Sequence, residues 1–295
     1  MTLKSCKQNC KRVNNQLEFY AMMRSGQHAI MHWIFAQIKE PIYFHNDILC
    51  HDGKKAYLDR GRWINVNSNP PIKTFPWYAY NMEDISIENI DEIKEKYREA
   101  LYIVPPKRET KILIIRDPFN LFASRYRFFG RLNTIRVKSR KKRMPKTKRT
   151  NANSKVAWFD DRAFYRWKEY AREALGETDF LGDKIIINYN HWFKHERYRK
   201  KISAKLGVNF SDEKLNFIPN NGYGSSFDTR DKNDDAQKMK VLDRWKRFGQ
   251  HDMFKEFFND YEMINLSLKL WPGLTKKVIK EMNLLTKKIR NEMGL

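Results

Sequence analysis

Short apolar runs alternate along the chain with segments whose apolar residues recur at helical spacing. Three of these runs are typical of buried strands, namely Leu17–Met23, Lys111–Ile115 and Lys184–Asn188. Each run stops abruptly at a polar turn. This alternation predicts an α/β fold of three layers, in which helices flank a central, mostly parallel sheet. Parallel sheets bind ligands at the carboxyl ends of their strands, so the three turns are expected at one edge.

Helices are expected after each of these strands and again in the C-terminal half. The first covers Gln27–Lys39, and the second begins at Pro118 with Asp117 as its N-cap and ends near Phe129. Further helical patterns cover His191–Leu206, Glu88–Leu101, Phe159–Leu175 and Lys276–Met293. The stretch Gly53–Asp84 has no clear period and is expected to be irregular.

Composition narrows the classes of protein. With 41% hydrophobic and 14% aromatic residues, the 295-residue chain can bury a sizeable core, which excludes general disorder. We expect a single domain over residues 1–295. Membrane-spanning runs are absent, and Met1–Asn15 contains no apolar signal segment, so a cytoplasmic location is expected. The three cysteines form neither a paired disulfide framework nor a CxxC zinc motif.

The charge is strongly positive and uneven. The 58 Lys and Arg residues exceed the 35 Asp and Glu residues, which gives a formal charge of +23. Ten of the basic residues lie in Arg131–Arg149, and residues 131–155 are expected to form a mobile basic insertion. A basic C-terminal helix over residues 276–293 adds to the excess. Such charge favours anionic partners, and binding of nucleic acid is the alternative function. The insertion lacks the interleaved aromatic residues that stack on bases, so this alternative is not favoured.

The turn Arg24-Ser25-Gly26 joins the first strand to its helix. Backbone N–H groups in such a turn point at an anion, the helix dipole adds positive potential, and glycine permits close approach. The nucleotide-triphosphate loop GxxxxGK[ST] is absent, so an Mg-ATP site is not expected. Taken alone, the turn is a weak motif and is more typical of an ordinary strand-to-helix connection.

A second polar group follows the second strand. Arg116 stands at the strand end, and Ser124 lies two helical turns further on, on the face that looks back at it. A guanidinium and a hydroxyl that converge in this way suit a bound phosphate. The alternative is that Arg116 pairs with Asp117 or caps a helix.

The two groups together resemble the motifs of the sulfotransferases that use 3′-phosphoadenosine 5′-phosphosulfate (PAPS). In that family, a strand–[RK]SGTT–helix motif binds the 5′-phosphosulfate and a strand–RDPxxxxxS–helix motif binds the 3′-phosphate. Here the first reads Arg24-Ser25-Gly26-Gln27-His28, and the second runs from Arg116-Asp117-Pro118 to Ser124. The weaker landmarks are an aromatic residue after the third strand and a Gly/Ser loop that closes over the nucleotide, here within Asn221–Phe227.

The resemblance implies a nucleotide-binding core like that of the P-loop proteins, with PAPS as the sulfuryl donor and no required metal. The residues that it assigns to the nucleotide are Arg24, Ser25, Gly26, Gln27, His28, Ala29, Arg116, Ser124, Tyr189, Ser225 and Ser226. This chain departs from the family in its first motif. Gln27 and His28 replace two threonines, and Ala29 stands where cytosolic members have a tryptophan that stacks on adenine.

The implied reaction is in-line transfer of a sulfuryl group to a hydroxyl or amine of a carbohydrate, lipid or small molecule. Arg24 would stabilise charge on the bridging oxygen as 3′,5′-ADP leaves. A base must take the proton of the acceptor. His45 is preferred because its ordinary pKa lies near working pH, and Asp47 is the second choice. The remaining candidates for the base are His28 and His51, and the aromatic candidates for an acceptor cleft are Trp63, Trp77 and Tyr78.

Overall fold

The computed structural model describes residues 12–46, 61–65, 74–96, 106–127, 161–218, 236–251, 254–255 and 258–284. Several of the predictions lie outside this part of the chain: the basic insertion over residues 131–155, Asp47, His51, Ser225 and Ser226. No helix within the described ranges is long and apolar enough to cross a membrane.

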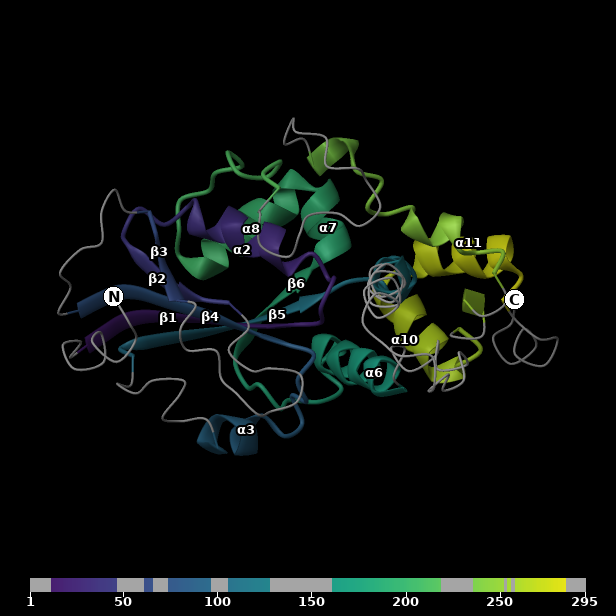
Figure 1. Cartoon of the computed structure of the whole chain (residues 1–295), viewed down its shortest axis with the longest axis horizontal. Helices are drawn as coiled ribbons and strands as arrows, with labels where there is room; N and C mark the ends of the chain where they lie inside the picture. The colour runs from purple at the N-terminus through teal and green to yellow at the C-terminus, as the bar shows by residue number, and fades with distance from the viewer. Residues whose placement is uncertain are drawn as a thin grey trace, which may run out of the picture.

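One six-stranded sheet forms the centre of the molecule, in the order β3-β2-β4-β1-β5-β6 (Figure 1). The strands are β1 (Arg12–Ala21), β2 (Ile42–His45), β3 (Gly61–Ile64), β4 (Thr74–Glu83), β5 (Arg108–Ile115) and β6 (Lys184–Asn188). Five strands run parallel, and only the edge strand β3 pairs antiparallel, with β2. The expected three-layer α/β fold with a mostly parallel sheet is therefore confirmed.

Helices cover both faces of the sheet (Figure 1). On one face lie α2 (Gln27–Phe35), α7 (Tyr189–Lys194) and α8 (Glu196–Leu206). On the other lie α3 (Ile90–Lys96) and α6 (Asp161–Leu175). A helix over residues 118–127 follows β5. The C-terminal part consists of η3 (Ala236–Lys238), η4 (Arg244–Arg247), α10 (Tyr261–Leu270) and α11 (Pro272–Met282).

The alternation of side chains along the strands divides the core into two halves. Phe19 of β1 packs in the cluster that contains Trp33 of α2, whereas its neighbour Tyr20 packs in the cluster that contains Trp167 of α6. Successive residues of a strand point to opposite faces, so one strand supplies both halves. The short apolar runs of the sequence reflect this burial on two sides.

The prediction that Gly53–Asp84 is irregular is wrong, because the stretch contains β3 and the whole of the central strand β4. Pro76 near the start of β4 and the polar residues Asn81 and Glu83 near its end hide the strand from a hydrophobic pattern. Tyr78 is buried in the core between them. Of the expected C-terminal helix over residues 276–293, residues 276–282 belong to α11, which begins at Pro272 and ends at Met282, and residues 285–293 lie outside the described ranges.

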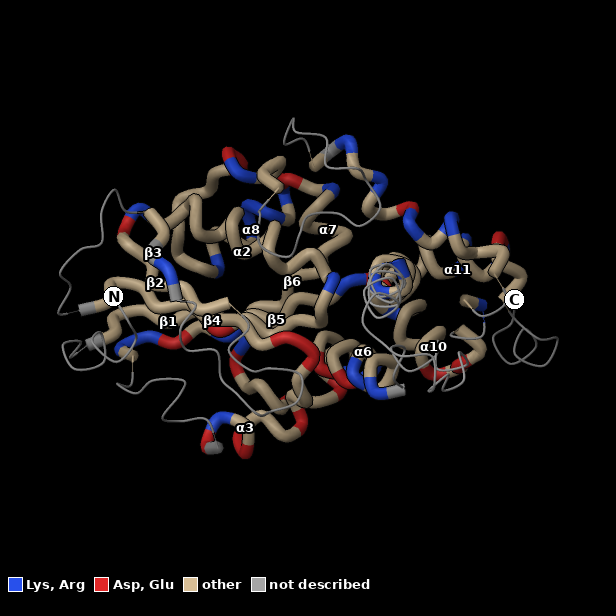
Figure 2. Tube along the Cα trace, in the orientation of Figure 1, with Lys and Arg blue, Asp and Glu red and all other residues tan. Residues whose placement is uncertain are grey.

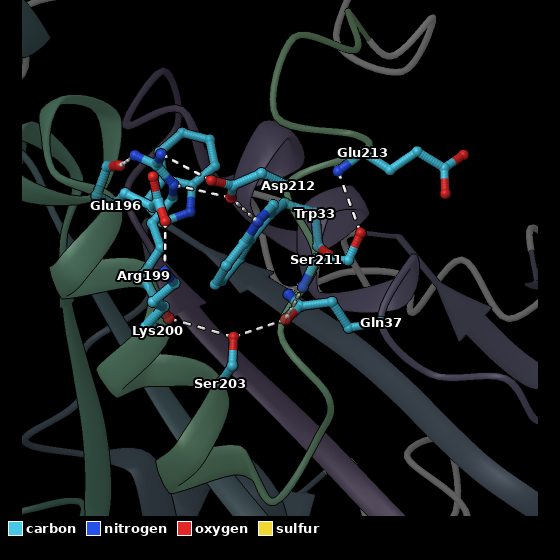
Figure 3. A network of polar contacts seen from close by, with 10 residues as sticks. Trp33, Gln37, Glu196, Arg199, Lys200, Ser203, Ser211, Asp212 and Glu213 are labelled. Carbon is cyan, nitrogen blue, oxygen red and sulfur yellow. Dashed lines mark hydrogen bonds and ion pairs between the residues drawn. The ribbon is translucent and has the colours of Figure 1, made fainter.

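A polar network fastens α2 to α8 and to the segment that follows it (Figure 3). Asp212 accepts hydrogen bonds from Arg199 at 2.9 and 2.8 Å and from the indole of Trp33 at 2.9 Å. Gln37, just beyond α2, accepts from the hydroxyl of Ser203 at 2.6 Å. The C-terminal half of α2 is therefore held by side chains from a segment far along the sequence.

A buried carboxylate lies on the opposite face of the sheet. Glu18 of β1 accepts hydrogen bonds from Tyr20 at 2.6 Å and from Tyr80, and it pairs with Lys94 of α3 at 2.6 Å. Burial acts to raise the pKa of Glu18, but hydrogen bonding to Glu109 and the charge of Lys94 outweigh it and lower the pKa to about 2. The same hydrogen bonding, with burial, raises the pKa of Glu109 to about 7.

Charge is distributed unevenly over the described surface. Lys and Arg gather over α8 and α11, whereas Asp and Glu are frequent near α3 and α6 (Figure 2). On α8 the exposed basic residues include Arg197, Lys200, Lys201 and Lys205. Within the described ranges, exposed positive charge therefore gathers over α8 and α11 (Figure 2).

We expect Asp212→Ala to lower the free energy of unfolding by about 2 kcal/mol, because it leaves the buried Arg199 without its carboxylate. Urea denaturation measures the change. Lys200→Ala is the control: its pair with Glu196 is exposed, and we expect a loss below about 1 kcal/mol. Equal losses in the two variants would contradict the structural role of Asp212.

We expect Glu109→Gln to change how stability depends on pH. The folded chain holds the Glu109 proton up to a pKa of about 7, against an ordinary value of 4.5, so this group stabilises fully below 4.5 and its contribution is lost as pH rises through 7. In Glu109→Gln, the free energy of unfolding should no longer show this decline with rising pH. The test is the difference in free energy of unfolding between the two proteins across this range, because the difference removes the contributions of titratable groups that both proteins share. Parallel curves would contradict it.

Candidate functional site

The carboxyl ends of four neighbouring strands meet at one edge of the sheet. Ala21, the last residue of β1, lies opposite Glu83 of β4 and Ile114 of β5. Ile115 in turn lies opposite Asn188, the last residue of β6. The turns that follow β1, β5 and β6 are therefore neighbours, as the sequence predicts.

The turn after β1 has an unusual backbone. Arg24 has φ of 72° and Gly26 has φ of 91°, both in the left-handed region, and the N–H of Ser25 donates to the carbonyl oxygen of Met22 at 3.1 Å. For an arginine this conformation is uncommon and occurs where surrounding contacts enforce it. The hydroxyl of Ser25 is buried and has no hydrogen-bond partner in the described part of the chain.

The Arg116 side chain joins this turn to the rest of the edge. Its exposed fraction is 2%, and its Nη1 donates to the carbonyl oxygen of Arg24 at 3.1 Å. Nη2 donates to the carbonyl oxygen of Val241, while Nε has no partner within the described ranges. Asp117 does not form an ion pair with Arg116. Its carboxylate accepts a hydrogen bond from the backbone N–H of Asn120 at 2.8 Å, which confirms the prediction that Asp117 is the N-cap of the helix.

Ser124 and two arginines form a second contact at this edge. The hydroxyl oxygen of Ser124 accepts from Nε of Arg24 at 3.4 Å and from Nη1 of Arg244 at 3.1 Å. The structure thus brings together Arg24, Arg116 and Ser124, and it adds Arg244 of η4. Sequence reasoning missed Arg244 because it lies far along the chain in a short helix that carries no motif or period.

The arginines make the site strongly positive. Burial lowers the pKa of Arg24 to about 10, with a further contribution from the charge of Arg116 and a smaller one from Arg125. The charge of Glu83 acts in the opposite direction. An anion between Arg24 and Arg116 would compensate charge that the protein has already desolvated. The site therefore suits a phosphate or a sulfate group.

Tyr189 packs directly on the glycine of the turn. A Cβ on Gly26 would lie 2.2 Å from Cε2 of the Tyr189 ring. The guanidinium carbon of Arg116 lies 4.7 Å from the centroid of the same ring. The Tyr189 ring therefore lies against Gly26 of the first motif and Arg116 of the second.

Gln27 and His28, which stand where the sulfotransferase motif has two threonines, contact groups on the β4 side of the site. Gln27 is buried, and its amide nitrogen donates to the carboxylate of Glu83. Nε2 of His28 lies 2.7 Å from Oδ1 of Asn46 and 3.9 Å from the Glu83 carboxylate. Burial lowers the pKa of His28, and the charge of Arg24 adds to this effect. Ala29 packs against the core on the α2 side.

His45, the preferred base, lies at the end of β2. Its Nδ1 is 2.9 Å from the hydroxyl of Tyr78, and its ring contacts Tyr43. Both tyrosines belong to the core on the face opposite α2. The role of His45 stays a prediction, as do those of Asp47, Ser225 and Ser226 in the undescribed segments. Within the described ranges, no group of three or more His, Cys, Asp or Glu could hold a metal ion.

We expect Gly26→Ala to lower stability by more than about 1 kcal/mol, because alanine at φ of 91° is strained and its methyl group would overlap the Tyr189 ring. Removal of the ring relieves only the overlap. The cost of Gly26→Ala should therefore be smaller in a Tyr189→Ala background, which a double-mutant cycle of thermal unfolding measures. Additive losses would show that the ring and the turn do not contact each other.

No model of a protein family matches the chain, and no curated protein is detectably similar in sequence. Among solved structures, the chain is similar to the mouse sulfotransferase SULT7A1 complexed with PAP, with 14% identity and a TM-score of 0.47 over 96% of this chain and 93% of that chain. It is also similar to the sulfotransferase domain of the Synechococcus PCC 7002 olefin synthase, with 14% identity and a TM-score of 0.43 over 90% and 97%. Both neighbours are sulfotransferases, and the likeness is one of fold alone.

Proposed function

We propose that the chain is a sulfotransferase that moves a sulfuryl group from PAPS to a hydroxyl or amine. The observation that carries this proposal is the junction of the two motifs: Arg116 donates to the carbonyl oxygen of Arg24, and Arg24 donates to Ser124. Strand ends distant in sequence supply these groups, which suits a ligand with anionic groups at two points. An ordinary strand-to-helix turn needs no such convergence.

The donor set fits the two ends of the nucleotide. The N–H groups at the start of α2 and the buried hydroxyl of Ser25 are suited to the 5′-phosphosulfate. The guanidinium groups of Arg116 and Arg244, with Ser124 between Arg24 and Arg244, are suited to the 3′-phosphate. Both Ser25 Oγ and Arg116 Nε are buried polar atoms without a described partner, which a bound anion would satisfy.

The chain's own residues would then perform three tasks. Arg24 places positive charge where the bridging oxygen becomes anionic, the role that preorganised donors have in other group transfers. The turn and the start of α2 fix the orientation of the phosphosulfate. Tyr189 confines the nucleotide beside Gly26. By analogy with phosphoryl transfer, positioning and charge supply most of the catalysis, and the proposed reaction has no required metal.

The acceptor is proposed only as a class: a carbohydrate, a lipid or a small molecule with a reactive hydroxyl or amine. A cytoplasmic location belongs to the same proposal. Of the aromatic candidates for the acceptor cleft, Trp77 of β4 is half-buried in the described structure.

We expect 3′,5′-ADP to raise the thermal stability of the chain, whereas 5′-AMP and ATP with Mg²⁺ raise it far less. A ligand at a hundred times its dissociation constant contributes about 2.7 kcal/mol. Ser124→Ala should reduce the preference for 3′,5′-ADP over 5′-AMP, because it removes a polar group at the proposed 3′-phosphate site. Arg116→Ala should abolish it.

Ser267→Ala is the matched control, since Ser267 is also buried in a helix and hydrogen-bonds Thr275 away from this edge. It should keep the full preference for 3′,5′-ADP. Stabilisation by ATP with Mg²⁺ instead would indicate phosphoryl transfer. No response to any of the three nucleotides would remove the proposal.

A further inference from the structure

Glu83 is a carboxylate that the sequence analysis did not single out, and it lies beside the proposed phosphosulfate site. It is the last residue of β4 and lies opposite Ala21, three residues before Arg24. Its exposed fraction is 7%. The strand order therefore places it next to the first turn of α2, on the β4 side of the site.

Two amides hold this carboxylate in place. Gln27 donates to Oε1 of Glu83 from α2, and Asn81 donates to the same oxygen at 3.3 Å from within β4. Hydrogen bonds from donors favour the ionised form of a carboxyl group. Nε2 of His28 lies 3.9 Å from this carboxylate. Burial lowers the pKa of Arg24 and raises that of Tyr170 on α6, and the charge of Glu83 acts to raise both.

The direction of in-line transfer selects this side of the site. In the proposed binding mode, the 3′-phosphate lies toward Arg116 and Ser124, which follow β5 on one side of β1. An in-line acceptor approaches sulfur from the side opposite the leaving group. That side faces β4, the neighbour of β1 in the other direction. Of the acidic side chains described there, Glu83 contacts the first turn of α2 directly.

We propose that Glu83 is the general base of the transfer and that Gln27 is the residue that positions it. The acceptor O–H bond breaks, and its proton passes to the Glu83 carboxylate. The acceptor oxygen forms a bond to sulfur, while the bond from sulfur to the bridging phosphate oxygen breaks. That oxygen keeps the electron pair and leaves as part of 3′,5′-ADP. This inference rests on the proposed function and explains the replacement of a family threonine by Gln27.

The alternative bases are placed less well for this step. Nε2 of His28 is engaged with Asn46 at 2.7 Å, and burial lowers the pKa of His28. His45 contacts Tyr78 and Tyr43 on the face of the sheet opposite α2. Their variants, His28→Gln and His45→Gln, are therefore comparison arms of the test.

The first experiment measures release of 3′,5′-ADP from PAPS with water as acceptor, in single turnover with the protein in excess. Glu83→Gln should slow release by about 100-fold or more, the usual contribution of a general base, while its dissociation constant for 3′,5′-ADP stays within a factor of three or so of the unmodified chain. Glu109→Gln is the matched control, because it makes the same change at the other end of the sheet. It should leave both quantities unchanged.

The second experiment needs no turnover. Carbon-13 NMR of side-chain carboxyl groups, with the Glu83 signal identified by its loss in Glu83→Gln, follows the ionisation of Glu83 in the complex with 3′,5′-ADP. We expect an ionised carboxylate at neutral pH. Gln27→Leu removes a donor to the carboxylate and should raise the titration midpoint, an effect that a purely structural role for Gln27 would not produce.

The outcomes separate the two proposals. A chain that fails to bind 3′,5′-ADP overturns the proposed function, whatever Glu83 does. With binding intact, a protonated Glu83 at neutral pH or an unchanged rate in Glu83→Gln overturns the role of Glu83. A large loss in His28→Gln or His45→Gln, with Glu83→Gln unaffected, assigns the base to that histidine instead. Loss of nucleotide affinity in Glu83→Gln makes Glu83 part of the nucleotide site.

Discussion

The site at the carboxyl ends of the strands depends on the contacts of one buried group, the guanidinium of Arg116. A desolvated charge needs compensating contacts, and groups from three separate segments contact this one: the carbonyl oxygens of Arg24 and Val241 and the ring of Tyr189. The backbone oxygen of Arg116 in turn accepts from the indole of Trp167 at 3.0 Å. Arg116 therefore fixes the positions of the first turn, the C-terminal part and α6 relative to one another.

Parts of this arrangement are local in the sequence and could be predicted from it. The segments that follow the short, mainly apolar runs Leu17–Met23 and Lys111–Ile115 carry Arg24, Arg116 and Ser124, and short-range patterns are enough to find them. The N-cap role of Asp117 is equally local. Tyr189 follows a strand whose predicted bounds match the observed ones.

The remaining parts depend on contacts that sequence spacing does not encode. β4 is central, yet Pro76 and its polar end conceal its period. Arg244 reaches Ser124 from 120 positions away, and Glu83 reaches Gln27 from 56 positions away. Neither residue belongs to a motif. The strand order brings Glu83 next to the first turn, and the packing of η4 brings Arg244 to Ser124.

The position of β1 in the sheet has a consequence for how the protein is made. Among the described strands β1 is translated first, but its two partners are β4 and β5, which are translated later. Until then both edges of β1 are unpaired, and unpaired strand edges promote association with other chains. Early packing of α2, the element that follows β1 in the chain, would cover one face of β1 until β5 has been translated.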